Sequence, residues 1–406
     1  MKEKHAWPVM LLAITLYLQN FIFALSYNII GPMLDNILKF YEMGVDSGGM
    51  MTLFQNVGGL IAVFVLMLVM DRLNKPATIM LPIAVFVASL LLMGLAPQFA
   101  IFMLLYGTLG MSMGTMDSLA NAIIPDIFVE GRTRALSFLH GAFGLGAIAS
   151  PIVVSSLLGS ELPWDTAYTL AGIVGAVILA LYVGAYMLSR KHLAVLRAHT
   201  MQHVKKTRIG LFMKDRRVWL IFICGFLFMA YQGGIIVWMT QYLRMEFNAV
   251  VQTASLALTF YWIGSTLCRF ITGASFMKLK PRTILIGGNL IAGLVLGIGV
   301  LSGNMIVLLV SIFLGGLANG SAIPLLVEVI CGWYPGNTGL ASSITFLSFY
   351  ISTALVPLGM GYLADRVSMT AAVLVPAVAV FLLGLAAINL PKDEDDALAV
   401  PEKGSI

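Results

Sequence analysis

Long uncharged apolar runs dominate the sequence, and they restrict the possible folds more than any other feature. The run "TIMLPIAVFVASLLLMGLA", residues 78–96, is typical, and it is close to the roughly 20 residues that a helix needs to span about 30 Å of hydrocarbon. Hydrophobic residues make up 59% of the 406-residue chain and charged residues 11%, a composition far outside the range of soluble domains. The sequence therefore predicts an all-α polytopic membrane protein.

Hydropathy predicts twelve transmembrane helices. The first apolar run is too long for a cleaved signal peptide, so we expect it to be retained as the first helix. The predicted spans cover residues 8–38, 48–70, 77–95, 98–124, 135–158, 165–189, 217–243, 249–277, 282–302, 304–332, 336–363 and 370–390.

The basic residues predict the orientation of the chain. If the N-terminus is cytoplasmic, 20 of the 24 Lys and Arg residues fall in the tails and cytoplasmic loops. Lys39, Arg244 and Arg366 then lie outside, and Arg269 lies within a span. Cytoplasmic loops of membrane proteins carry such an excess of positive charge. We therefore expect both termini in the cytoplasm, and the basic pI does not imply a nucleic-acid partner.

A basic segment, residues 190–216, divides the spans into two groups of six. We expect an N-terminal six-helix bundle over 1–189, a C-terminal bundle over 217–391 and a cytoplasmic tail over 392–406. The three histidines of the basic segment leave a regulatory or metal site open, but its charge pattern favours a linker at the anionic lipid surface. The three cysteines all fall inside predicted spans and have no metal-binding spacing.

The two groups of six spans contain repeated elements. "KPATIML" begins at Lys75 and "KPRTILI" at Lys280, a shift of 205 residues, and the same shift relates Gly110 to Gly315. Two six-span repeats in one orientation are related by an axis along the membrane normal. In this arrangement, with its basic central loop, the chain resembles the major facilitator superfamily over its full length.

A short motif supports this resemblance. "MDRLNKP", residues 70–76, is similar to the superfamily's loop 2–3 motif, in which an acid, Asp71 here, is followed by Arg72 and a basic residue, Lys75. The resemblance implies that Asp71 caps a helix of the other half and pairs with an arginine after span 4, either Arg132 or Arg134. We expect Asp71, Arg72 and Arg134 to form a gate.

A carboxylate lies at membrane depth in "MGTMDSLANAIIPD", residues 113–126. An acid there costs roughly 2.5–3.5 kcal/mol, so it usually faces a cavity or a partner. Asp117 and Asn121 are four residues apart and share one helix face. We interpret Asp117 as the ion-coupling group and Asn121 as a substrate-binding residue. A purely structural carboxylate is the alternative.

Three further polar groups lie within predicted spans. Arg269 and Glu328 have opposite charges and lie toward the cytoplasmic ends of spans 8 and 10, so we expect a structural ion pair. His140 in span 5 is suited to hydrogen-bonding a hydroxylated ligand or moving a proton, although a simple interhelical bond is the alternative.

Span 7 reads "MAYQGGIIVWMTQYL" and combines aromatic rings with amides. Such a surface suits sugars, because the rings cover apolar C–H faces and the amides bind hydroxyls. Isolated polar residues at membrane depth also occur in spans 1, 2 and 10. We take these as further candidates for substrate binding: Tyr231, Gln232, Trp238, Gln241, Asn28, Gln55 and Asn319.

The region from Gly114 to 151 resembles a narrower family, the fucose/glucose/galactose–proton symporters and their sodium-dependent glucose transporter branch. The shared residues are Gly114, Asp117 and Asn121, followed by "LH" at 139–140 and "GLGA" at 144–147. The resemblance implies that Asp117 acts in coupling or sugar binding. The fucose symporters carry a second acid in span 1, where this chain has Gly31, so coupling to protons, to sodium or to no ion stays open.

We therefore predict a secondary transporter of a small polar solute, most specifically a hexose, that works by alternating access. The rival prediction is a proton-coupled efflux antiporter for lipophilic drugs or lysolipids, because 24 methionines suit a promiscuous cavity. No nucleophile–base pair or metal constellation indicates an enzyme. We expect a monomer in a bacterial inner membrane, with no cofactor apart from a coupling ion, H⁺ or Na⁺.

Overall fold

The computed structural model describes residues 7–43, 46–128, 130–160, 162–201, 209–274 and 279–391, and these residues are almost entirely helical. The helices are α1 Trp7–Tyr27, α2 Ile30–Phe40, α3 Asp46–Val69, η1 Met70–Arg72, α4 Lys75–Thr78, α5 Met80–Met93, α6 Phe99–Ile127, α7 Arg132–Gly159, α8 Thr166–Met201, α9 Ile209–Lys214, α10 Arg216–Phe247, α11 Val251–Gly273, α12 Pro281–Leu301, α13 Met305–Asn319, α14 Ala322–Trp333, α15 Thr338–Arg366 and α16 Met369–Ala387.

The predicted transmembrane architecture is confirmed. Within the described residues, eleven helical segments are long and apolar enough to cross a membrane. The twelfth predicted span corresponds to α11, which has 23 residues and more polar groups, Arg269 among them. It packs between α13 and α7 in the position that the repeat requires.

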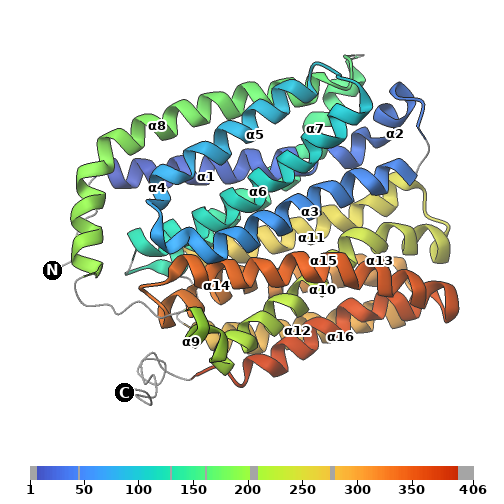
Figure 1. Cartoon of the computed structure of the whole chain (residues 1–406). Coiled ribbons are helices and arrows are strands. Elements are labelled where there is room, and N and C mark those ends of the chain that lie inside the picture. The colour runs from blue at the N-terminus through green and yellow to red at the C-terminus, as the bar shows by residue number, and fades with distance from the viewer. Residues whose placement is uncertain are drawn as a thin grey trace.

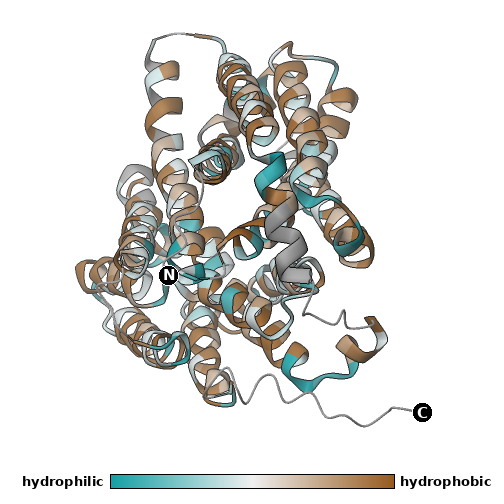
Figure 2. Ribbon diagram, turned by 90° about the vertical axis from the view of Figure 1, so that its left-hand side faces the viewer, coloured by the Kyte–Doolittle hydropathy of each residue, from teal (hydrophilic) through white to brown (hydrophobic). Residues whose placement is uncertain are grey.

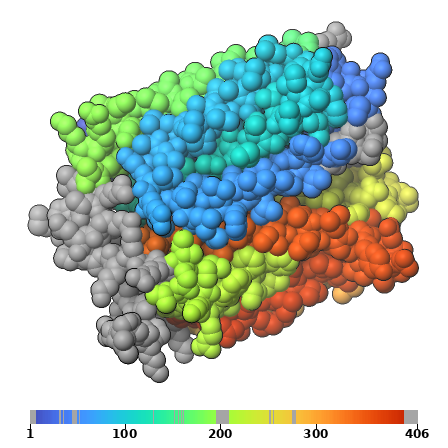
Figure 3. Space-filling model, viewed as in Figure 1, coloured from blue at the N-terminus to red at the C-terminus, as the bar shows by residue number. Residues whose placement is uncertain are grey.

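The chain folds into two halves that lie one above the other (Figure 1). Helices α1 to α8 form the upper half and α10 to α16 the lower, and the colours of the space-filling view separate along the same boundary (Figure 3). Across this boundary α7 packs on α11 and α14, and α15 packs on α3 and α6. α1 begins and α16 ends at one end of the molecule, which we call the inner end.

Hydrophobic residues, coloured brown, make up most of the helical ribbon (Figure 2), and many large apolar side chains are exposed. Leu95, Leu301 and Leu358 are each at least 70% exposed. A water-soluble protein would expose few such residues together, whereas a bilayer accepts them without cost.

Close backbone contacts between helices define the register of the repeat. A Cβ on Gly58, Gly110 or Gly114 would lie 2.2, 1.9 or 2.9 Å from the carbonyl oxygens of Gly107, Gln55 and Gly59. The same contacts recur 206 residues later, where Gly264, Gly316 and Gly320 approach the carbonyl oxygens of Phe313, Tyr261 and Ser265. Within these helices the shift is therefore 206 residues. Gly110 corresponds to Gly316, not to Gly315 as the sequence suggested.

Three of the predicted spans are interrupted. The span predicted over 8–38 divides into α1 and α2, the span over 77–95 into α4 and α5 at Ile79, and the span over 304–332 into α13 and α14 at Gly320–Ser321. At the first break the amide of Asn28 donates to the carbonyl oxygen of Ala24 at 2.7 Å. The same oxygen also accepts from the backbone N–H of Asn28 at 3.2 Å, and the N–H of Ile29 donates to Ser26 at 3.3 Å, so the α-helical pattern gives way to a tighter turn.

The predicted linker overlaps regular structure at both of its ends. α8 continues to Met201, and the short helix α9 buries Phe212 against the ring of Tyr334, 4.8 Å away. Asp215 caps α10 by accepting from the backbone N–H of Arg217 at 2.9 Å. Burial raises the pKa of Asp215, but hydrogen bonds from Arg217 and Tyr334 outweigh it and hold the pKa below its usual value.

We predict that Gly110→Ala lowers the melting temperature of the detergent-purified protein. The added methyl group would overlap the carbonyl oxygen of Gln55 and push α3 away from α6, and overpacking of this kind costs about 1–3 kcal/mol. Gly184→Ala is the matched control, because its Cβ meets no atom within 4 Å. Equal melting temperatures for Gly110→Ala and the wild type would contradict the close contact.

Candidate functional site

A hydrogen-bonded chain of polar side chains crosses from α6 to α7 in the N-terminal half. The amide nitrogen of Asn121 donates to the Asp117 carboxylate at 3.0 Å, and its oxygen lies 2.9 Å from Nε2 of His140. Asn121 and His140 are buried, whereas Asp117 keeps partial exposure. The arrangement orients the carboxylate and leaves its second oxygen available to a cation or to a donor group.

Arg269 of α11 approaches this chain from the C-terminal half. Its Nη1 donates to the backbone oxygen of His140 at 3.0 Å, and its Nε donates to that of Gly320 at 2.9 Å. The Gly320 oxygen lies where α13 ends, so the guanidinium satisfies a carbonyl that the helix break exposes. Arg269 is buried, lies over the ring of Trp262 and is within electrostatic reach of Asp117.

The expected ion pair between Arg269 and Glu328 is not what the structure shows. Glu328 instead accepts a hydrogen bond from the hydroxyl of Thr133. Arg269 donates its hydrogen bonds to the backbone oxygens of Gly320 and His140. The error arose because the break between α13 and α14, which turns the Gly320 oxygen toward α11, leaves no clear signal in hydropathy.

A tyrosine that the sequence did not indicate also reaches this region. The ring of Tyr350, on α15, lies against Gly59 and Gly114, where added Cβ atoms would lie 2.4 and 3.1 Å from its atoms. It is within electrostatic reach of Asp117. Glycines on α3 and α6 thus make room for an aromatic side chain from the other half, beside the carboxylate.

The span-7 candidates form a second polar cluster in the C-terminal half. The hydroxyl of Tyr261 donates to the side-chain oxygen of Gln232 at 2.9 Å, and the Tyr261 ring packs edge-on against that of Tyr231. The Tyr231 hydroxyl is buried without a hydrogen-bond partner among the described residues. Asn319 donates to Asn289, and its own side-chain oxygen has no such partner.

The structure gives the remaining substrate-binding candidates other surroundings. Asn28 binds its own helix, and the Gln55 amide contacts the sulfur of Met113 at 3.4 Å. Trp238 donates to the backbone oxygen of Pro357 at 3.1 Å, and Gln241 is exposed. These contacts do not bring the four residues to Asp117. Among the described residues, no group of three His, Cys, Asp or Glu side chains is arranged to hold a metal ion.

A latch closes the inner end of the molecule. The Asp71 carboxylate accepts from the backbone N–H groups of Gly339 and Leu340, both at 2.9 Å, and so caps α15 of the other half. Lys75 lies 3.2 Å from Asp71 and 2.9 Å from Asp126. The hydroxyl of Thr338 donates to Asp126 at 2.6 Å.

The predicted basic members of the gate are placed differently. Arg134 is exposed and lies over the ring of Phe138, and Arg72 is exposed. Lys75 is instead the basic residue that bridges the acids of the N-terminal half and α15. Of the two arginines expected to pair with Asp71, Arg134 thus lies elsewhere, and Lys75 pairs with Asp71.

We predict that Asp71→Ala opens the inner end. Cys331 is buried beside this latch, and its thiol faces the backbone oxygen of Thr338. In a protein carrying Cys224→Ala and Cys268→Ala, Asp71→Ala should raise the maleimide-labelling rate of Cys331 several-fold, because each lost bond to a charged group is worth about 1.5–3 kcal/mol. Asp365→Ala, an exposed acid near the other end of α15, is the control. An unchanged labelling rate would show that the latch does not hold α15.

Comparisons with known proteins identify relatives over most of the chain. A family model described as Major Facilitator Superfamily matches residues 16–249 and 221–405. A TsgA homolog from Erwinia tasmaniensis is 24% identical over 258 residues, which are 63% of this chain and 62% of that protein. The chain thus spans less than two thirds of this relative. The inner membrane transport protein YdiN of Escherichia coli K12 is 20% identical, over 88% of this chain and 84% of its own.

Solved structures of similar fold include transporters of different solutes. FucP in its outward conformation superposes with a TM-score of 0.77 at 15% identity, covering 95% of this chain and 100% of that one. The human organic anion transporter MFSD10 reaches 0.75 at 17% identity, covering 94% and 99%. The proton:xylose symporter XylE reaches 0.73 at 14% identity, covering 93% and 94%. At these identities the likeness establishes the fold alone.

Proposed function

The chain belongs to the major facilitator superfamily and is a multi-pass membrane transporter rather than an enzyme, and we propose that it carries a hexose by alternating access with coupling to H⁺ or Na⁺. The observation that carries the proposal is the chain Asp117–Asn121–His140 at the boundary between the halves. A carboxylate kept at membrane depth usually has a role in transport.

The chemistry of the site supports a polyhydroxylated solute. Asn121 and His140 both donate and accept hydrogen bonds, and Gln232, Tyr231 and Tyr261 add an amide and two rings on the C-terminal side. Sugar sites combine such amides with aromatic faces. FucP and XylE, which share the fold, are described as fucose:proton and proton:xylose symporters.

Alternating access requires the halves to separate at one end while they close at the other. In this structure Asp71 and Thr338 hold the inner end closed, so we propose that the solute enters from the other end. Arg269 bonds to α7 across the boundary near Asp117, so we propose that a cation or solute on Asp117 changes the balance of charge beside that bridge. Transport would then depend on the occupancy of Asp117.

The membrane and the assembly follow from the same proposal. We propose a bacterial inner membrane, which the name of YdiN supports, with both termini in the cytoplasm and a monomer as the functional unit. The proposed substrate is a small molecule, and no nucleic acid takes part.

The test measures transport of radiolabelled sugars in proteoliposomes, both as accumulation driven by an ion gradient and as exchange against preloaded sugar (counterflow). Wild-type protein should accumulate at least one of D-glucose, D-galactose and L-fucose when a pH or sodium gradient is imposed. Asp117→Asn should lower gradient-driven accumulation at least tenfold while sugar exchange persists, because an amide neither takes up a proton nor neutralises a cation.

Asp365→Asn, which removes an exposed acid far from the site, is the control. If wild type and Asp117→Asn respond alike to every gradient, the coupling role of Asp117 is wrong. If the wild type carries none of the sugars, the hexose assignment is wrong.

A groove between α3 and α6 favours a second candidate, efflux of lipophilic compounds coupled to protons. Its volume is about 350 Å³ and its lining is almost entirely apolar: Leu53, Phe54, Val57, Gly58, Ile61, Leu104, Gly107, Thr108 and Met111. Thermal-shift screening separates the two candidates. Stabilisation by lysolipids or hydrophobic cations, and by no sugar, would favour this second function.

A further inference from the structure

Gln19 of α1 is a buried amide whose hydrogen-bonding groups are all unused. Its side chain is 0% exposed, and neither Nε2 nor Oε1 has a partner among the described residues. Leaving one buried polar group unpaired typically costs about 1–3 kcal/mol, so an amide with both groups unpaired is unusual in a folded protein.

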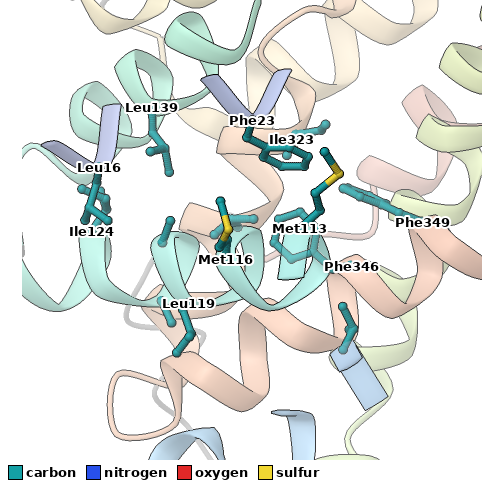
Figure 4. Packing of buried hydrophobic residues seen from close by; sticks show 14 of the residues in the cluster. Leu16, Phe23, Met113, Met116, Leu119, Ile124, Leu139, Ile323, Phe346 and Phe349 are labelled. Atoms are coloured by element: carbon teal, nitrogen blue, oxygen red, sulfur yellow. The ribbon is translucent and has the colours of Figure 1, made fainter. Parts of the chain in front are cut away.

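The position of Gln19 on α1 directs it toward Asp117. It lies three residues after Leu16 and four before Phe23, so the three share one helix face. In Figure 4 Leu16 and Phe23 point toward α6, where Met113 and Ile124 are labelled, and all four belong to one hydrophobic cluster.

Asp117 lies four residues after Met113 and seven before Ile124, on the same face of α6. Gln19 and Asp117 therefore interrupt two apolar stripes that face each other.

A neighbouring contact fixes the level of Gln19 along the helix axis. The amide nitrogen of Asn20 donates to the backbone oxygen of Leu139 at 3.0 Å. The next residue, His140, holds Asn121. Gln19 therefore lies at the depth of the chain Asp117–Asn121–His140. The side-chain oxygen of Asn20 is also unpaired, so two amides of α1 leave free hydrogen-bonding groups at this depth.

The free groups of Gln19 restrict the chemistry of what binds there. A metal ion would satisfy the oxygen and leave the two N–H donors unpaired, and an apolar molecule would satisfy neither. A hydroxyl can both accept and donate a hydrogen bond. Two adjacent hydroxyls therefore match the amide of Gln19, which has N–H donors and an acceptor oxygen. The partly exposed carboxylate opposite requires a donor, which a hydroxyl also supplies.

We propose that Gln19 binds the hydroxyl groups of an occluded polyhydroxylated solute, opposite Asp117, and sets the preference of the site for sugars. The inference rests on the proposed hexose transport and adds a residue of α1 to the site. Because Gln19 is fully enclosed in this structure, the proposed contact requires the surrounding helices to move apart before the solute binds.

The test compares wild type with Gln19→Met, which keeps the shape of the side chain and removes its hydrogen bonds. Sugar affinity is measured on the full-length protein in nanodiscs with D-glucose, D-galactose, L-fucose and the monodeoxyglucoses. The dissociation constant of the best sugar should rise about tenfold. One deoxy analogue should bind wild type and Gln19→Met equally, because its missing hydroxyl is the partner of Gln19.

Thr15→Val is the matched control, since the Thr15 hydroxyl is buried on the same helix and bonds within it to the Leu12 oxygen at 2.8 Å. Its sugar affinity should equal that of the wild type. Melting temperature without sugar provides a second readout. Gln19→Met should melt at or above the wild-type temperature, because it removes an unpaired buried amide.

The outcomes distinguish the two proposals. If the wild type binds sugar and Gln19→Met binds it equally well, the role of Gln19 is wrong and the hexose proposal stands. A sugar-free melting temperature clearly below that of wild type, or failure of Gln19→Met to fold, would show a structural hydrogen bond and overturn the inference. If the wild type binds no sugar on the panel, both proposals fail.

Discussion

Inside a bilayer a polar group that leaves water must find its partner within the protein, and this constraint organises the structure. The Gly320 carbonyl, exposed by the break between α13 and α14, accepts from Arg269. At the break after α1 the Asn28 side chain donates to the Ala24 oxygen, which also accepts the backbone N–H of Asn28. The Gln19 amide and the Tyr231 hydroxyl have no hydrogen-bond partner among the described residues, and their unpaired atoms are buried inside the bundle. Those are the places where a polar solute gains most by binding.

The two halves share the same helix packing, but each of the polar residues Asp117 and Tyr350 at the candidate site occurs in one half only. Gly58, Gly110 and Gly114 have equivalents 206 residues later that make the same close backbone contacts, because both halves solve one packing problem. The same shift relates Asp117 to Ile323 and Tyr350 to Gly144. The carboxylate and the tyrosine beside it therefore belong to opposite halves, and neither has a polar equivalent. Asp117 and Tyr350 meet only because the two halves of this one chain differ in sequence at these positions.

The central site and the inner latch are connected through the same few helices. α15 carries Tyr350 beside Asp117 and, at its beginning, the backbone N–H groups that Asp71 caps. α7 carries His140 at the site and Thr133, which bonds to Glu328, at the inner end. These two helices therefore join the central site to the inner end of the molecule. This geometry suits a transporter in which occupancy controls which end opens.

Hydropathy by itself predicted the helical membrane fold, matched motifs predicted the six-plus-six repeat, and polar groups at membrane depth marked Asp117, Asn121 and His140 as candidates, because all of these follow from local composition and spacing. Asp71 was also predicted as a helix cap. Tertiary structure alone decided that Arg269 bonds to backbone oxygens rather than to Glu328, that Lys75 replaces Arg134 in the latch, and that the amide of Gln19 is buried without a partner among the described residues. Arg269 binds an oxygen 129 positions away and a second oxygen that a helix break exposes, and Lys75 donates to Thr338, 263 positions away. Their partners are chosen by packing between helices, which no local pattern records.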